Sequence, residues 1–371
     1  MFRNIKGQDH ALQILSTAID NDRIAQAYLF HGMSGVGKFT TALYFGMALN
    51  CLSKNEFRPC GVCSSCHKFL CLDHPDFIYV FPTPNLQLTA EGEIKKKEVR
   101  VEYEAFFKNK IESPWLDFYF SSGTEIRKDS IAGLIRRLEI SSYEAIYRVC
   151  IVEDAEMMNI PTANSFLKTL EEPPKNTVII LVTNRLSMLL PTIQSRCQPI
   201  YFKPLTRGVI EQLLRDKFDA EHALARTASR IANGSVKNAV RMLQGSAGVI
   251  RELAFELFDL AYRDQEYAFL NFSLRIREQL NAAFLADLIS CVAFIVSDIC
   301  IFGNNPEEIT NVDKYELYKA LKQDEEAFSE AAPEFLIALE DLKRKIDGNV
   351  NQYLILVGLF MRFRKLFRDT R

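Results

Sequence analysis

Short apolar runs alternate with helical patterns of hydrophobic residues between about Ala27 and Leu205. The clearest of these runs predict strands over Ala27–Phe30, Tyr147–Val152 and Thr177–Val182, and each run leads into a loop that carries polar residues. Strands that alternate with helices are typical of an α/β fold built on a parallel sheet. Because ligands of such sheets bind beyond the carboxyl ends of the strands, we expect the functional site at that edge.

The pattern becomes purely helical after the sheet region. It is compact from Thr206 to about Gln244 and then continues as longer amphipathic segments to the end of the chain. Three domains are therefore predicted, namely an α/β domain over residues 1–205, a small helical domain over residues 206–244 and a larger all-α domain over residues 245–371.

A stretch from Phe81 to Thr124 interrupts the α/β region. It begins with two prolines, contains the mixed-charge run EGEIKKKEVRVEYE among scattered aromatic residues, and fits no sheet strand. Runs of mixed charge are usually solvated. We therefore interpret residues from about 81 to 124 as an insertion that forms a solvated, partly helical excursion rather than an arm that binds nucleic acid.

Composition and charge narrow the class of protein. Hydrophobic residues make up 48% of the chain and charged residues 25%, which is typical of a soluble globular protein. The formal net charge of −2 excludes a globally basic nucleic-acid binder, so any DNA contact has to come from a local patch. The basic cluster near the end is interpreted as a solvated helix terminus and comprises Arg362, Arg364, Lys365 and Arg368.

No segment of the sequence predicts a membrane protein. The first ten residues lack an apolar signal core, and the run Tyr353–Met361 is too short to cross a bilayer. We therefore expect a cytoplasmic protein that has no membrane partner.

Four of the nine cysteines form a tight group between residues 51 and 66. Cys51, Cys60, Cys63 and Cys66 have the spacing C-x₈-C-x₂-C-x₂-C. In a reducing compartment such a group indicates a metal site rather than disulfides. Four thiolates can close a tetrahedral shell around Zn²⁺, which predicts a structural zinc module over residues 51–66. An iron–sulfur cluster is the alternative, because it uses the same four ligands.

The segment HGMSGVGKFTTAL follows the first predicted strand and leads directly into a helical pattern. Gly32, Gly35 and Gly37 let backbone N–H groups turn inward around phosphates, and Lys38 neutralises the outer phosphates at the start of the helix. This order of strand, glycine-rich loop and helix predicts a phosphate-binding loop. The retained lysine leaves binding of ATP open.

The position that should hold a metal ion departs from the motif. A phosphate-binding loop places a hydroxyl directly after the lysine to hold Mg²⁺, but here Phe39 follows Lys38. Hydroxyls come only at Thr40 and Thr41. Thr40 could substitute only if the loop shifted by one residue, which rotates a helical side chain by about 100°. The loop is therefore expected to hold Mg²⁺ poorly.

A second acidic segment follows the strand Tyr147–Val152. Glu153 and Asp154 have the form of a Walker B segment, but with the usual order of aspartate and glutamate reversed. Each carboxylate is displaced by about 1.5 Å, the length of one C–C bond. Catalytic positioning tolerates only about 0.5 Å. Together with Phe39, this predicts that the chain's own ATP hydrolysis is absent or weak, while an acidic turn that caps a helix is the alternative interpretation.

Further segments carry a resemblance to a known family. These are Gly7-Gln8, ANSFLKTLEEPP at residues 163–174, LPTIQSRC at residues 190–197 and Gly234-Ser235. With the phosphate-binding loop and the cysteine module, they resemble the clamp-loader subunits of the AAA+ class, specifically the bacterial DNA polymerase III gamma/tau and delta-prime subunits. The resemblance covers about residues 2–244 apart from the insertion.

The resemblance implies roles for several residues. Arg196 would act as an arginine finger that reaches, in trans, the γ-phosphate of ATP held by an adjacent subunit. Thr183 and Asn184 would form the sensor 1 region, and Lys237 stands where the sensor 2 helix usually has an arginine. Residues 206–244 would form the lid, and residues 245–371 would form an oligomerisation collar.

The resemblance also implies partners. These are the gamma/tau and delta subunits in a hetero-oligomeric ring, a sliding clamp and primer–template DNA, all within the DNA polymerase III holoenzyme. Delta-prime subunits commonly have degenerate nucleotide motifs, so Phe39 and Glu153-Asp154 favour a delta-prime-like subunit. The alternatives are an ATP-hydrolysing motor of the gamma/tau type and a binding module of another AAA+ ring.

Overall fold

The computed structural model describes the chain except for residues 1, 3, 54–57, 88–93, 116, 117, 119, 141, 245, 322–324, 348, 349 and 371. It divides the chain into two compact units. The first comprises Met1–Val209 and Gly234–Lys237, and the second comprises Ile210–Asn233 and Asn238–Arg371.

The first unit is built on a five-stranded parallel sheet with the strand order β2-β3-β4-β1-β5. The predicted parallel α/β fold is therefore confirmed, and the three predicted strands agree with β1, β3 and β4 to within one residue. The edge strands β2 and β5 are short and were not among the predicted strands. The strand bounds are Ala27–His31 for β1, Phe77–Val80 for β2, Arg148–Val152 for β3, Thr177–Thr183 for β4 and Gln198–Tyr201 for β5.

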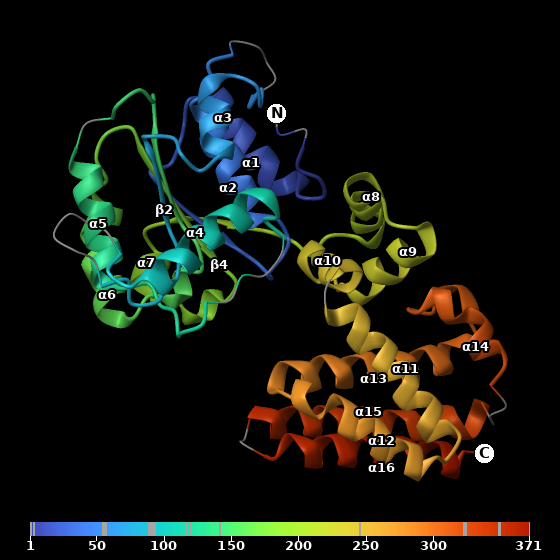
Figure 1. The fold of residues 1–371 in the computed structure, drawn as a ribbon. Helices are drawn as coiled ribbons and strands as arrows, with labels where there is room; N and C mark the ends of the chain where they lie inside the picture. Colours follow the sequence, from blue (N-terminus) through green and yellow to red (C-terminus); the bar gives the residue numbers. More distant parts are fainter. Residues whose placement is uncertain are drawn as a thin grey trace. The chain divides into compact units, whose positions relative to one another are not determined.

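Alternating side chains of the strands bury both faces of the sheet. Tyr28 and Phe30 of β1 pack into a core with α1, α2 and α3 on one face, whereas Ala27 and Leu29 pack with α5 and α6 on the other (Figure 1). This alternation follows from the two-residue period of a strand. The helix bounds are Asp9–Asp20 for α1, Lys38–Leu49 for α2, Ser64–Leu70 for α3, Lys128–Glu139 for α5, Ile160–Glu171 for α6 and Pro191–Gln194 for α7.

The predicted insertion contains a helix, α4, which runs from Lys97 to Glu112. Its partly helical character agrees with the sequence, but its description as a solvated excursion is wrong for one face. Tyr103, Phe106 and Phe107 of α4 contact the ring of Phe81, and the Phe106 and Phe81 rings stack with centroids 4.1 Å apart. The helix is therefore packed against the residues that follow β2.

The second unit is all-helical, and among its described residues there is no strand. Its helices bury one continuous hydrophobic core, which is lined mainly by α11, α13, α15 and α16 (Figure 1). The helix bounds from the end of the sheet onward are Arg207–Phe218 for α8, His222–Ile231 for α9, Val236–Gln244 for α10, Ser246–Tyr262 for α11, Glu266–Ile276 for α12, Ala282–Phe302 for α13, Tyr315–Lys319 for α14, Glu325–Asp347 for α15 and Gln352–Asp369 for α16.

Helix α13 is long and apolar enough to cross a membrane by length and composition, with a mean hydropathy of 2.2 in its most apolar window. It is a longer candidate than Tyr353–Met361. In the structure it is a core helix of the second unit, where Leu288, Val292 and Val296 are buried against neighbouring helices. Burial inside the unit accounts for its apolar composition.

Helix α13 also carries a buried carboxylate. Asp298 is fully buried and accepts hydrogen bonds from the backbone N–H groups of Thr310 and Asn311, from Asn311 Nδ2 at 2.7 Å and from the Tyr318 hydroxyl at 3.1 Å. Arg251 in turn donates to Asn311 Oδ1 at 2.8 Å. This network ties the loop before α14 to the core helices.

Replacing Asp298 by alanine is expected to destabilise the second unit by about 3 kcal/mol, because four donors lose a buried charged acceptor. Urea unfolding followed by circular dichroism measures this effect. Asp287→Ala is the matched control, because Asp287 lies on the same helix, is partly exposed and pairs with Arg241 at 3.4 Å. We expect that control to cost about 1 kcal/mol or less. Equal effects of the two variants would contradict the role given to Asp298.

Candidate functional site

The glycine-rich segment forms the predicted loop between β1 and α2. Gly37 has φ 93° at the N-cap of α2, and Gly35 has φ 77°. Both angles lie in the left-handed region, which glycine adopts without steric cost. A Cβ at Gly35 would lie 2.1 Å from Ser235 Oγ, so the loop also needs glycine for its close approach to the segment Gly234–Lys237.

Lys38 lies inside this loop, and only 5% of its surface is exposed. Its Nζ donates to Gly32 O at 2.8 Å, to Met33 O at 2.6 Å and to Asn184 Oδ1 at 2.9 Å. Burial lowers the pKa of Lys38 to about 8, although the charges of Asp154, Glu156 and Glu153 act in the opposite direction. The ammonium thus lies among hydrogen-bond acceptors of the loop and of the segment after β4. A phosphate group at this place would compete with these acceptors for the hydrogen bonds of Lys38.

No hydroxyl of α2 is available at the metal position. Thr40 is exposed, and Thr41 is buried with its hydroxyl bonded to Gly37 O at 2.8 Å. The Phe39 ring lies instead against the Tyr79 ring, with centroids 5.1 Å apart. Phe39 therefore replaces a metal ligand with an apolar surface.

The acidic segment after β3 separates its two carboxylates. Glu153 accepts hydrogen bonds from the Tyr79 hydroxyl and from Lys110 Nζ, the latter at 2.8 and 2.7 Å to its two oxygens. Asp154 accepts from Asn184 Nδ2 at 2.7 Å. Burial raises the pKa of Asp154 to about 6, and the Glu153 and Glu156 charges act in the same direction. Of these two carboxylates, only Asp154 is linked through Asn184 to Lys38. The backbone N–H of Asn184 also donates to Glu156 Oε1 at 3.1 Å.

The residues present do not fit Mg²⁺. This ion requires near-octahedral oxygen ligands at about 2.0–2.1 Å. Phe39 offers no oxygen, and both oxygens of Glu153 already bind the Lys110 ammonium. No step of a metal-assisted hydrolysis is therefore assigned to this chain.

The sensor residues take different places in the site. Asn184 lies between Lys38 and Asp154, whereas the fully buried Thr183 accepts from Arg185 N at 3.1 Å through its hydroxyl. Lys237 lies near the loop, because a Cβ at Gly35 would come within 2.6 Å of its Cβ. The charge of Lys237 also lowers the pKa of Lys38, as the smallest of the contributing effects.

The four cysteines of the predicted module converge. The Sγ atoms of Cys51, Cys60, Cys63 and Cys66 all lie within 4.8 Å of one another, and those of Cys60 and Cys66 are 4.0 Å apart. A tetrahedral zinc site with Zn–S bonds of about 2.3 Å places its sulfurs about 3.8 Å apart, so the donor set fits Zn²⁺.

Backbone N–H groups support these thiols. Those of Cys60, Cys63 and Cys66 each lie 3.4 Å from the Sγ of the preceding cysteine of the module, and Cys63 thereby caps α3. The N–H groups of Val62 and Cys63 lower the pKa of Cys60 to about 6. Hydrogen bonds to sulfur stabilise thiolates, which are the form that binds metal.

The nearby Cys71, His67 and His74 are not part of this convergence. Cys71 is exposed and lies 3.8 Å from His67 Nδ1, and the ring of the buried His74 lies 4.4 Å from the Phe69 ring centroid. These residues therefore have local partners of their own.

Arg196 follows the short helix α7 and is partly exposed, with 31% of its side chain accessible. Its Nε donates to Glu171 Oε1 at 2.7 Å, and its Nη1 donates to Thr192 O at 2.8 Å. Glu171 is the last residue of α6, a helix that Asn159 caps by accepting from Thr162 N at 3.0 Å. Two of the segments that carry the resemblance, residues 163–174 and 190–197, thus meet at one ion pair.

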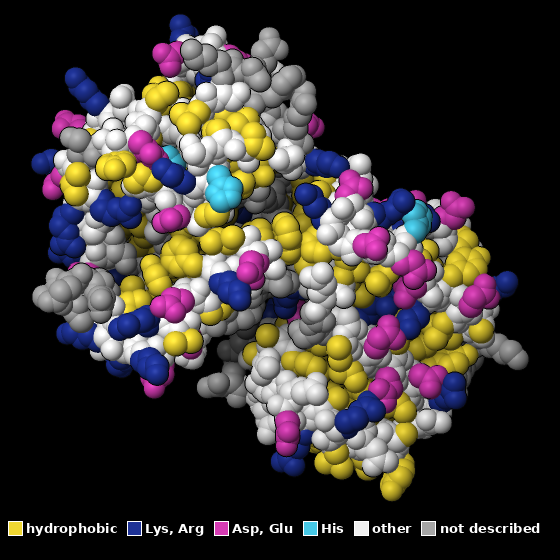
Figure 2. Space-filling model, turned by 45° about the horizontal axis from the view of Figure 1, so that its top comes forward, with side chains coloured by type: hydrophobic (Ala, Val, Ile, Leu, Met, Phe, Trp, Pro, Cys, Tyr) yellow, Lys and Arg dark blue, Asp and Glu magenta, His cyan; other side chains and the backbone are white. Residues whose placement is uncertain are grey.

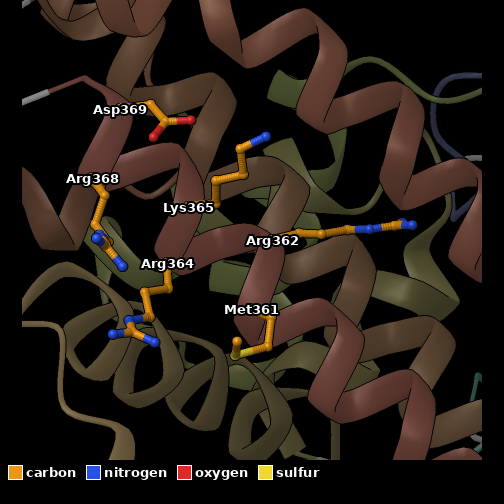
Figure 3. Close-up of a pocket in the computed structure, with 6 residues that line it drawn as sticks. All are labelled: Met361, Arg362, Arg364, Lys365, Arg368 and Asp369. Carbon is orange, nitrogen blue, oxygen red and sulfur yellow. The ribbon is translucent and has the colours of Figure 1, made fainter.

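The terminal cations line a shallow hollow on α16 with Met361 and Asp369 (Figure 3). Two of them have internal partners, because Arg364 pairs with Asp264 and Glu266, and Arg362 donates to Ala338 O at 3.0 Å. Figure 2 shows basic and acidic side chains interspersed over the face that it presents. The interpretation of the cluster as a solvated helix end is therefore wrong for Arg364, whose side chain is only 14% exposed.

Sequence reasoning missed several residues of the site, namely Tyr79, Lys110, Glu156, Glu171 and Asn184 as the partner of Lys38. Lys110 did have a signal in the sequence. It follows Tyr103, Phe106 and Phe107 at spacings of seven, four and three residues, which places all four on one face of a helix.

The parallel sheet, the loop between β1 and α2 and the acidic segment after β3 define a P-loop protein of the AAA+ class. The chain belongs to the DNA polymerase III delta subunit family, because the sequence model of the family described as "DNA polymerase III, delta subunit" matches residues 7–206, more than half of the chain.

Individual relatives differ in their sequence identity to this chain and in the part of the chain that they match. DNA polymerase III subunit delta' of Bacillus subtilis is 26% identical over 351 residues, which cover 93% of this chain and 92% of that protein. DNA polymerase III subunit gamma/tau of Mycobacterium bovis is 32% identical over 213 residues, which cover 57% of this chain but only 30% of the relative. A gamma subunit-related protein of Thermotoga maritima has a solved structure that covers 96% of this chain and 100% of its own, at 16% identity and a TM-score of 0.46.

Proposed function

We propose that this chain is a delta-prime-like subunit of the DNA polymerase III clamp loader and supplies Arg196 in trans to the ATP site of a neighbouring subunit. One contrast carries the proposal. The metal position of the chain's own loop is occupied by Phe39 and the Lys110–Glu153 pair, whereas Arg196 stands on a partly exposed surface. Similarity to a delta' subunit along 93% of the chain supports the same assignment.

The chemistry of Arg196 suits this role. A guanidinium delivered across an interface stabilises the charge that spreads over a phosphoryl group during transfer. Glu171 holds the Nε side of the guanidinium, and this contact limits the rotamers that the long side chain can adopt. A side chain ordered in this way loses less entropy when it meets a phosphate.

The proposed assembly is a hetero-oligomeric ring with gamma/tau and delta subunits in the cytoplasm. This ring would open a sliding clamp and place it at primer–template DNA with ATP bound by its other subunits. Residues 206–244 would be the lid and residues 245–371 the collar through which the ring assembles. The cysteine module would hold structural Zn²⁺ and form a rigid knob for a neighbour rather than a reaction centre.

A motor of the gamma/tau type is the second candidate, and the intact Lys38 in its glycine-rich loop favours it. For the delta-prime-like subunit we expect no ATP turnover by the purified chain in Mg²⁺, and no change in the Lys38→Ala variant. Phosphate release measured with a coupled assay tests this. Mg²⁺-dependent turnover that disappears in Lys38→Ala would establish the motor instead.

A further inference from the structure

The helix of the insertion brings a cation to the place where a P-loop site holds its metal ion. In P-loop proteins two groups hold Mg²⁺, the residue directly after the lysine and the acid of the Walker B segment. These are Phe39 and Glu153 in this chain. Lys110 Nζ lies 4.0 Å from the centroid of the Phe39 ring and 2.7 Å from the Glu153 carboxylate.

The groups that contact Lys110 Nζ favour a positive charge at this place. Glu153 receives the ammonium with both oxygens, and the negative face of the Phe39 ring attracts the same charge. The side chains of Lys110 and Glu153 are only 13% and 18% exposed. Burial of either ion alone is costly, so each stabilises the other in this position.

The packing of α4 determines where Lys110 lies. Phe106 stacks on Phe81, and Phe107 meets the edge of the Tyr79 ring with centroids 6.1 Å apart. The Tyr79 hydroxyl also donates to Glu153. One aromatic cluster therefore supports both the lysine and the carboxylate.

We propose that the Lys110 ammonium takes the place of the divalent cation in this site and excludes that cation from it. A metal ion bound to Glu153 at about 2 Å would meet the ammonium at close range, and the two like charges would repel each other strongly. The insertion thus replaces an exchangeable metal ion with a covalently attached cation. This inference concerns the chain by itself and does not depend on assembly into a ring.

Binding of Mn²⁺ to the full chain, followed by electron paramagnetic resonance in the presence of ADP, tests the proposal. We expect no stoichiometric Mn²⁺ site in the unaltered chain. The double variant Phe39→Thr, Lys110→Ala restores a hydroxyl and frees Glu153, and we expect it to gain a site. In the matched control, Phe39→Thr with Lys108→Ala, an exposed lysine of the same helix is removed and no site should form.

Two outcomes would overturn the proposal. One is a Mn²⁺ site in the unaltered chain that Glu153→Gln removes, and the other is a double variant that binds no more Mn²⁺ than its Lys108 control. A thermal-unfolding cycle of Lys110→Met and Glu153→Gln tests the contact itself without any metal ion or nucleotide. We expect the melting temperature of the double variant to be no lower than that of the less stable single variant. Additive decreases in melting temperature would show that the pair does not form.

Discussion

Replacing Arg196 by alanine is expected to lower the clamp- and DNA-stimulated ATP hydrolysis of the reconstituted ring by about 10³-fold at the site that this arginine serves. The reason is that the guanidinium would no longer stabilise the charge that spreads over the transferred phosphoryl group. Phosphate release by a ring whose other subunits are unaltered measures the effect. Hydrolysis that stays at the unaltered rate would refute the trans role.

The stability of the chain provides the control for this experiment. Arg196 pairs with Glu171 on the surface, where an ion pair contributes about 1 kcal/mol or less. Arg196→Ala should therefore melt close to the unaltered chain and still enter the ring. Arg196→Lys keeps the charge but loses the planar fork, so it should recover only part of the rate. A ring that does not assemble with Arg196→Ala would show that the residue is structural instead.

Removal of the metal from the cysteine module is expected to unfold the segment from Cys51 to Cys66. Structural zinc sites contribute about 10–16 kcal/mol of apparent binding free energy in small peptides. A short segment has no other interactions that could replace so large a stabilising free energy. Cys60→Ser with Cys63→Ser should abolish zinc binding, as measured by mass spectrometry of the metal content. Hydrogen exchange of the module should rise to that of an unfolded peptide.

Cys71→Ser is the matched control for the zinc experiment. Cys71 is exposed and lies outside the converging thiols, so this variant should retain its zinc and its exchange protection. The unaltered chain should contain one zinc ion and show no visible absorption. Iron with visible absorption would identify a cluster of iron and sulfur instead, and a stable chain without metal would contradict both alternatives.

Some features of the fold followed directly from the sequence. The strands β1, β3 and β4 are continuous apolar runs, because a parallel sheet buries both faces of its central strands. Two of the four residues of the edge strand β5 are polar or proline, so its pattern carries little signal. The other edge strand, β2, is apolar throughout but only four residues long, and it was missed for its length. The insertion shows the same limit, since its charges concealed the aromatic face of α4.

The sequence alone determined the phosphate-binding loop and the cysteine module, because both depend on residue types at fixed short spacings. Phe39 and the reversed Glu153-Asp154 pair could be recognised in the same way. Only the tertiary structure decided that Lys110 meets Glu153, 43 residues away, and that Arg196 meets Glu171, 25 residues away. Such pairs form where separate elements pack together, and no local pattern specifies which side chains then face each other.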